Sequence, residues 1–354
     1  MVYIRACGKT TESISLEAHM TNRERFMGTL NFQMPDDRLP LLEWASWWDK
    51  TLTRWHGEGL PAELDGDSIH TFFQLDPQRQ FWISPRGAGF PAMAHGQGPV
   101  TDRASYVAIK PFLYSADAVL NIRDRLQALK GLQERGEVVV WLTLEGFFWF
   151  PRTLFGIENH LYAFFDEPEL MEEMNCDLTA FHLKVLSEIR EILIPDFMTF
   201  AEDMSYNNGP MLSKAQFDAF LLPYYRQIMP VLAEMGTLPL VDTDGKVDPM
   251  IPWLLEAGIR GVLPLERKSG VDVARIRANY PDFRLVGGFD KTVMHLGETA
   301  IRTEFERLLP VMRKGGFIPS VDHQTPPAVS LADYRLYRRL LEEYCVKACE
   351  GKEG

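Results

Sequence analysis

The chain has 354 residues, is 46% hydrophobic and carries a formal net charge of −12 at pH 7. This length fits one α/β barrel, which takes about 250 residues or more with insertions. The acidic charge argues against nucleic acid, which selects a basic face. No apolar run approaches the roughly 20 residues that span a bilayer, and the first residues lack a signal-peptide core. We therefore expect a soluble, cytoplasmic protein.

Before residue 112 the chain shows no regular rhythm of elements, and residues 50–110 are its least regular part. Residues 1–20 show little periodicity and are predicted to form an arm. Thr21 and Glu24 then have the spacing of a capping box before an amphipathic helix. The run LPLLEW at 39–44 is predicted as the first strand. Residues 50–110 are predicted to form accessory strands, at 71–75 and 81–84, and loops over one end of the domain.

From residue 112 onwards, strand-like apolar runs alternate with helical segments. The predicted strands lie in VVVWLTLEG, FMTFAED, LPLVDTDG, IRGVLPLE, RLVGGFDK and FIPSVDH. The predicted helices lie near 115–135, 165–192, 213–235, 248–257, 297–314 and 330–350. This alternation indicates parallel βα units. About eight strands predict a single (β/α)₈ barrel over 21–354 with an N-terminal helical or irregular extension. A doubly wound open sheet is the alternative, although no GxGxxG follows a first strand.

Acidic and imidazole side chains follow several predicted strands. Asp242 and Asp244 lie at i and i+2, so an extended backbone points both carboxylates to one face. Asp322 and His323 follow another strand in the same way. Other polar strand-end residues are Glu145, Glu202, Asp203, Glu266 and Lys291. Barrel active sites lie at the carboxyl ends of the strands, so these residues predict a polar site there. Capping of the following helices is the alternative for each aspartate.

Aromatic residues stand beside the same strand ends. The aromatic residues of 44–48 and 147–155, among them Trp44, Trp47 and Phe148, are candidates to line an organic-substrate pocket, with core packing as the alternative. Tyr206 is a candidate proton donor or substrate contact. Lys291 is a candidate to hold a substrate carboxylate, with a solvated lysine at a helix start as the alternative.

Four segments together resemble the uroporphyrinogen decarboxylase superfamily. They are FAEDMSYNNGPMLSKAQFDAFLLPYYRQI, GIRGVLPLE, LVGGFDK and GGFIPSVDHQTPPAVSLADY. The superfamily also contains corrinoid- and coenzyme-M-type methyltransferases, and the resemblance implies a barrel. True uroporphyrinogen decarboxylases carry an RQAGR segment near the first strand, where this chain has LPLLEWASWWDK with Glu43. The resemblance therefore implies that a polyacidic porphyrinogen would be repelled there.

The resemblance also implies a metal site with changed ligands. Thiol methyltransferases of the superfamily bind zinc through a His-x-Cys pair and a cysteine on the last strand. Asp242 and Asp244 take the positions of the pair, and Asp322 or His323 takes that of the last cysteine. We therefore expect either a divalent metal, zinc or another, on Asp242, Asp244 and His323 with Glu266 as a supplement, or no metal.

Three functions follow as hypotheses. The first is transfer of a methyl group between a small ether, amine or thiol and a corrinoid. The chain lacks a DxHxxG cobalamin motif, so a partner protein would carry the corrinoid. The second is decarboxylation, or other acid/base chemistry, on a porphyrinogen-like or small organic acid. The third is a non-catalytic tetrapyrrole- or corrinoid-handling module. For the enzymatic hypotheses the catalytic candidates are His323, Glu202, Asp203 and Tyr206, and a homodimer is left open.

Overall fold

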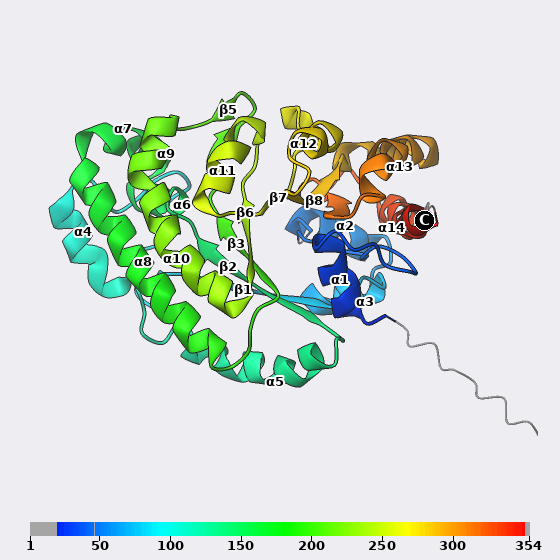
Figure 1. Cartoon of the computed structure of the whole chain (residues 1–354), viewed down its shortest axis with the longest axis horizontal. Coiled ribbons are helices and arrows are strands. Elements are labelled where there is room, and N and C mark those ends of the chain that lie inside the picture. The colour runs from blue at the N-terminus through cyan, green and yellow to red at the C-terminus, as the bar shows by residue number, and fades with distance from the viewer. Residues whose placement is uncertain (1–19, 46, 351–354) are drawn as a thin grey trace, which may run out of the picture.

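The computed structural model describes residues 20–45 and 47–350, shown in Figure 1. The predicted arm at 1–20 lies outside the described residues, apart from Met20. Within the described part, no helix has both the length and the apolar character needed to cross a membrane.

The centre of the fold is a parallel sheet of seven strands. Its order is β1 (Gln78–Ile83), β2 (Val139–Glu145), β3 (Phe197–Ala201), β6 (Leu238–Asp242), β7 (Gly261–Leu263), β8 (Arg284–Phe289) and β9 (Phe317–Val321). A separate hairpin pairs β4 (Ser205–Tyr206) with β5 (Gly209–Pro210). The predicted α/β fold with parallel βα units is therefore confirmed, and the sheet curls into an incomplete barrel.

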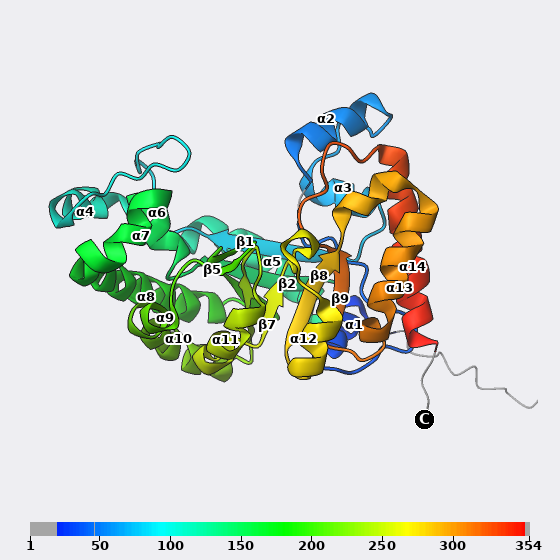
Figure 2. The same cartoon turned by 90° about the horizontal axis from the view of Figure 1, so that it is seen from above.

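Most of the helices cover the outer side of this sheet (Figures 1 and 2). The first seven are α1 (Asn22–Leu30), α2 (Asp49–Gly57), α3 (Gly66–Phe72), α4 (Arg103–Ile109), α5 (Arg123–Glu134), α6 (Trp149–Phe155) and α7 (Ile157–Asp166). The others are α8 (Pro168–Arg190), α9 (Lys214–Phe220), α10 (Leu222–Met235), α11 (Ile251–Ala257), α12 (Val273–Asn279), α13 (Glu298–Met312) and α14 (Leu331–Cys349). The predicted capping box of α1 is confirmed, because Thr21 and Glu24 each accept the other's backbone N–H.

Strands β2, β3, β7 and β9 are buried along their whole length, which explains their continuous apolar sequences. Within β2, Val139 and Trp141 face the inside of the curled sheet, whereas Val140, Leu142 and Leu144 belong to the large core outside it. The inner layer consists of Phe26, Leu30, Leu42, Val139, Trp141, Phe197, Leu240, Leu263, Val286 and Ile318. Phe26 and Leu30 come from α1, so this helix supplies part of the barrel interior.

Two strand predictions near the N-terminus are wrong. The run at 39–44 is extended but forms no strand, because Pro40 cannot donate to a ladder. It links the two edges of the sheet through a few bonds: Leu41 O accepts the N–H of Asp76 at 2.9 Å, and Trp44 Nε1 donates to Val321 O at 2.8 Å. The sheet therefore has seven strands and not eight. The predicted strand at 71–75 is the end of α3 and the turn that follows it.

Candidate active site

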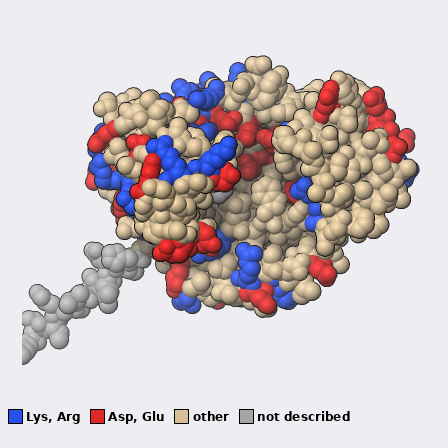
Figure 3. Space-filling view, turned by 180° about the vertical axis from the view of Figure 1, so that it is seen from behind, with Lys and Arg blue, Asp and Glu red and all other residues tan. Residues whose placement is uncertain are grey.

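The carboxyl ends of four neighbouring strands lie at one level. Glu145 of β2 is in register with Ala201 of β3, Ala201 with Asp242 of β6, and Asp242 with Leu263 of β7. Side chains that follow these positions are therefore brought to the same end of the barrel. Figure 2 shows α2 and α3 on one side of the molecule and α4, α6 and α7 on the other. Figure 3 shows a hollow between two such halves, with acidic side chains gathered on its wall.

A cavity of about 150 Å³, which we call the inner cavity, lies at these strand ends. Three tryptophans line it: Trp44, Trp82 and Trp149. Its polar residues are Glu202, Asp203, Asp242, Asp244 and His323. The structure thus brings together five of the predicted polar residues and Trp44.

Asp244 and His323 form the polar pair of the inner cavity. Their Oδ2 and Nε2 atoms are 3.5 Å apart, and the imidazole meets the Trp44 ring edge-on at 6.3 Å between centroids. The contact with Asp244 raises the pKa of His323 above its ordinary value. Burial, together with repulsion from Asp244 and Asp203, raises the pKa of Asp242 to about 8. Asp242 therefore keeps its proton at neutral pH when the cavity holds no cation.

Asp203 stands at a tight turn after β3. Its φ is +44°, a left-handed conformation that aspartate tolerates better than most residues. Arg152 Nη1 donates to Asp203 Oδ2 at 3.2 Å and to Asp203 O at 3.1 Å. Burial and the nearby Asp244 raise the pKa of Asp203. The arginine therefore fixes this carboxylate at the edge of the inner cavity.

Glu202 is fully buried and holds the backbone beside the cavity. Its carboxylate accepts the N–H groups of Phe147, Phe148 and Trp149 at 2.9, 2.7 and 3.1 Å. The hydroxyl of Tyr225 donates to the same carboxylate. Burial raises the pKa of Glu202 to about 7, although these donors lower it. With both oxygens engaged, Glu202 is a positioning residue that places Trp149 and the start of α6, and not a catalytic acid.

The choice between Asp322 and His323 is settled by their surroundings. Asp322 is fully buried and accepts the backbone N–H groups of Arg267 and Lys291 at 3.0 and 3.2 Å. Lys291 Nζ also pairs with it at 3.1 Å. His323 is thus the residue that faces the cavity, and Lys291 is committed to Asp322.

Several predicted substrate contacts lie outside the inner cavity. Trp47 is 6% exposed and packs against Trp55, Phe73 and Tyr334. Phe148 is buried against His160 and Phe164. Both belong to the core, because their helices and loops turn these rings away from the strand ends.

Tyr206, Glu266 and Glu145 are also placed away from the inner cavity. Tyr206 lies on β4 with 47% of its surface exposed. Glu266 Oε2 accepts the N–H of Gly245 at 3.0 Å, so it supports the turn after Asp244. Glu145 is fully buried and accepts from Ser84 and Arg86. A substrate contact for these residues gains no support from their positions.

The predicted metal ligands do not form a ligand set. Among residues 20–45 and 47–350, no three His, Cys, Asp or Glu side chains are arranged to hold a metal ion. His323 approaches Asp244 directly instead. The metal site therefore stays a prediction, and no step of the proposed chemistry uses a metal ion bound by these residues.

Trp82, Arg86 and Arg152 were not singled out from the sequence, and Trp149 was included only within the aromatic run 147–155. Trp82 lies on β1, where the sequence indicated an accessory strand at 81–84 and not a strand of the barrel. A second cavity of about 480 Å³, the outer cavity, is formed by the loop 86–97 together with Trp149, Arg152, Ile157 and Asp203. It shares Trp149 and Asp203 with the inner cavity. The two cavities are therefore neighbours.

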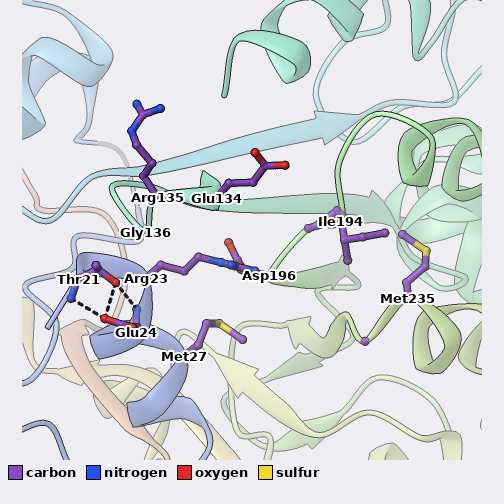
Figure 4. A pocket seen from close by; sticks show the side chains of 12 residues that line it. Thr21, Arg23, Glu24, Met27, Glu134, Arg135, Gly136, Ile194, Asp196 and Met235 are labelled. Atoms are coloured by element: carbon purple, nitrogen blue, oxygen red, sulfur yellow. Dashed lines mark hydrogen bonds and ion pairs between the residues drawn. The ribbon is translucent and has the colours of Figure 1, made fainter. Parts of the chain in front are cut away.

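A further cavity of about 420 Å³ lies at the opposite end of the barrel (Figure 4). Residues that precede β2, β3 and β6 line it together with the start of α1. Arg23 Nε pairs there with the buried Asp196 at 2.5 Å. This end of a barrel carries stability and not chemistry, so the strand-end cavities are the candidate active site.

Glu43 replaces the arginines expected at its position, but it does not face the inner cavity. It is 1% exposed and accepts from Ser320 Oγ at 3.1 Å and from the Tyr334 hydroxyl at 3.0 Å. The predicted repulsion of a polyacid by this residue is therefore wrong. Burial raises the pKa of Glu43 from 4.5 to about 8.

The raised pKa of Glu43 makes stability depend on pH. The folded state keeps a proton that the unfolded chain loses, so the stabilisation is complete below pH 4.5 and is lost as the pH rises to about 8. Glu43→Gln stays neutral, and we expect it to exceed the native protein in stability at pH 8 by roughly 3 kcal/mol. Urea unfolding at pH 5 and pH 8 measures this. The exposed Glu63→Gln is the control, and a pH-independent difference would contradict the prediction.

Comparison with known proteins identifies the family. Residues 152–344, more than half of the chain, match the family model "Uroporphyrinogen decarboxylase (URO-D)". The fold and the strand-end site thus define a barrel-like α/β protein with a polar cavity at the carboxyl ends of its strands. The chain belongs to the uroporphyrinogen decarboxylase (URO-D) family, as the resemblance predicted.

A similar solved structure shares the fold. A methyltransferase from Methanosarcina mazei superposes with a TM-score of 0.62 at 16% identity, over 92% of this chain and 99% of that chain. A protein assigned as a vitamin-B12-independent methionine synthase, from Listeria monocytogenes, gives a TM-score of 0.45 at 10% identity, over 90% and 99%. A search of curated proteins gives no match.

Proposed function

We propose that this protein is a methyltransferase that takes a methyl group from a small methylated amine held in the inner cavity. The observation that carries the proposal is the convergence of three tryptophans, three aspartates and one histidine on this cavity. Membership of the URO-D family and the shared fold of a methyltransferase support the reaction class.

The walls and charges of the inner cavity favour a cationic donor. Aromatic faces attract an organic cation such as a methylated ammonium, and the attraction is strongest for tryptophan. The aspartates repel one another, as the raised pKa of Asp242 shows, and a bound cation relieves that repulsion. A volume of about 150 Å³ matches that of cavities that hold a benzene-sized group. An organic acid, by contrast, meets like charge here, so decarboxylation is the less favoured hypothesis.

Proton transfer follows from the chemistry of the leaving group. When the N–CH₃ bond breaks, its electron pair stays on nitrogen and the methyl group passes to a nucleophile. A tertiary amine must therefore be protonated first, so that a neutral secondary amine leaves. A tertiary amine already carries this proton in neutral water. In this proposal His323, oriented by Asp244, therefore keeps the proton on nitrogen inside the acidic cavity and returns it when a cavity carboxylate takes it. A quaternary ammonium needs no proton, because it leaves as a neutral tertiary amine.

The acceptor that we propose is a corrinoid carried by a partner protein. When bound, it supplies the nucleophile that receives the methyl group. Trp82, one wall of the inner cavity, is 48% exposed, so a donor held there stays accessible from outside. The residues of this chain bind and orient the donor and keep a tertiary amine protonated.

The test uses purified protein, cob(I)alamin and a panel of methylated donors. Formation of methylcobalamin is followed by absorbance for tertiary and quaternary amines, methyl ethers and methyl thioethers. We expect transfer from amines, and we expect Asp242→Asn to reduce it about tenfold or more by removing a cavity acid. Transfer from ethers or thioethers alone would contradict the amine assignment. Release of CO₂ from organic acids without methyl transfer would favour the decarboxylase hypothesis.

A further inference from the structure

The outer cavity differs in charge from the inner cavity beside it. Its titratable groups include two guanidinium groups, those of Arg86 and Arg152. Phe90, Met93 and Ile157 contribute apolar surface to the same cavity. Asp203, which lines both cavities, pairs with Arg152, and His95 also lines the outer cavity. A ligand that extends from the inner to the outer cavity therefore passes from a site without arginine to a site that holds two.

Arg86 is held in place from behind by a buried acid. Glu145 is fully buried, and its Oε1 accepts from Arg86 Nη2 at 2.5 Å. Ser84 Oγ accepts from Arg86 Nε at 3.3 Å. Nη1 takes part in neither of these bonds, and 32% of the side chain is exposed. The guanidinium is thus fixed in orientation while one edge stays accessible.

Arg152, which also lines the outer cavity, is fixed in a comparable way. Its guanidinium carbon lies 5.3 Å from the centre of the Trp149 ring, and Nη1 donates to Asp203. Neither bond uses Nε or Nη2. Two arginines with oriented, partly engaged guanidinium groups are suited to a planar oxyanion, because Arg152 keeps Nε and Nη2 for two parallel N–H donations and Arg86 keeps Nη1.

We propose, on the basis of the proposed function, that the substrate is a zwitterion. Its methylated ammonium occupies the inner cavity, its carboxylate meets Arg86 and Arg152 in the outer cavity, and a short hydrocarbon linker lies along the apolar wall between them. The substrate class is therefore that of N-methylated amino acids and related trimethylammonium carboxylates.

The first test measures binding to the unaltered protein by titration calorimetry, so it requires neither corrinoid nor turnover. The probes are ω-trimethylammonium carboxylates with one to five methylene groups, the matching primary carboxamides, and tetramethylammonium. We expect one chain length to bind best, and its carboxamide to bind about tenfold more weakly or worse, because a charge-assisted contact is lost.

The second test locates the carboxylate. Arg86→Gln removes one guanidinium, and the double variant Arg86→Gln/Glu145→Gln removes the pair together, so that no buried charge is left alone. Arg79→Gln is the matched control, because Arg79 pairs with Asp67 near the same strand and does not line the cavity. We expect both Arg86 variants to bind the trimethylammonium carboxylate about tenfold more weakly and to keep the native affinity for tetramethylammonium.

The outcomes separate the two proposals. Equal binding of carboxylate and carboxamide, or an unchanged carboxylate affinity in both Arg86 variants, would overturn the zwitterion while the amine assignment stands. Failure of every ammonium probe, tetramethylammonium included, would overturn the proposed function as well. Plain carboxylates of the same lengths, which lack the ammonium group, complete the set of probes. If one of them binds most tightly, the placement of the cation in the inner cavity is overturned.

Discussion

Replacing Glu202 with alanine is expected to lower the free energy of unfolding by about 4 kcal/mol, because it leaves several buried donors without an acceptor. Those donors are the backbone N–H groups of residues 147–149 and the hydroxyl of Tyr225. Urea unfolding at neutral pH measures the loss. Since three of the donors are backbone groups, no side-chain rearrangement can remove them from the interior.

Two companion variants make this expectation specific. Tyr225→Phe removes one of the four donors and leaves the carboxylate its three amides, so we expect a loss of only about 1 kcal/mol. Glu63→Ala, at an exposed glutamate, should change stability by less than about 0.5 kcal/mol. A Glu202→Ala protein as stable as the Glu63→Ala protein would show that α6 is held by other contacts.

Replacing His323 with glutamine is expected to lower methyl transfer from tertiary amines about a hundredfold and from quaternary ammonium donors less than about threefold. The reason is that only a tertiary amine needs a proton before its methyl group can leave. Initial rates with both donor types, taken over a range of pH, measure the difference. The effect on tertiary donors should appear in kcat, because the proton is required for the chemical step.

His295→Gln provides the matched control for His323→Gln. His295 is exposed in the 3₁₀ turn Lys291–Leu296 and does not line the inner cavity. The same substitution there should leave both rates within about a factor of two of the native values. An equal loss for tertiary and quaternary donors in His323→Gln would indicate that the histidine orients the substrate and supplies no proton.

The alternation of strands and helices made the fold predictable from the sequence. The incomplete closure of the barrel could not be predicted in this way. Apolar runs such as VVVWLTLEG show burial on both faces, and the capping box at Thr21 marks a helix start by local spacing alone. The segment 39–44 is apolar enough for a strand, but Pro40 and the few bonds available between the sheet edges exclude a ladder. Edge pairing depends on distant residues and leaves no local periodic signal.

The candidate site was predictable where chemistry coincides with a strand end. Asp242, Asp244 and His323 met that condition, and the structure places all three on one cavity. Glu202 met it too, yet its partners come from residues 147–149 and from Tyr225. Sequence spacing cannot reveal that both of its oxygens are already engaged. Arg86 and Arg152 were missed because they follow a strand or lie on a helix without any motif of their own.

The two cavities are built from different kinds of backbone. Strand register fixes the level of the aspartates, while a single loop, 86–97, supplies most of the outer cavity. Its far end is anchored at Gly98, where an added Cβ would lie 2.1 Å from Leu154 O. If the proposed substrate is correct, insertions or substitutions within the loop should therefore alter which substrate tail is accepted without moving the strand-end acids. Specificity for the tail and reactivity toward the methyl group would then be separable by exchanging this loop.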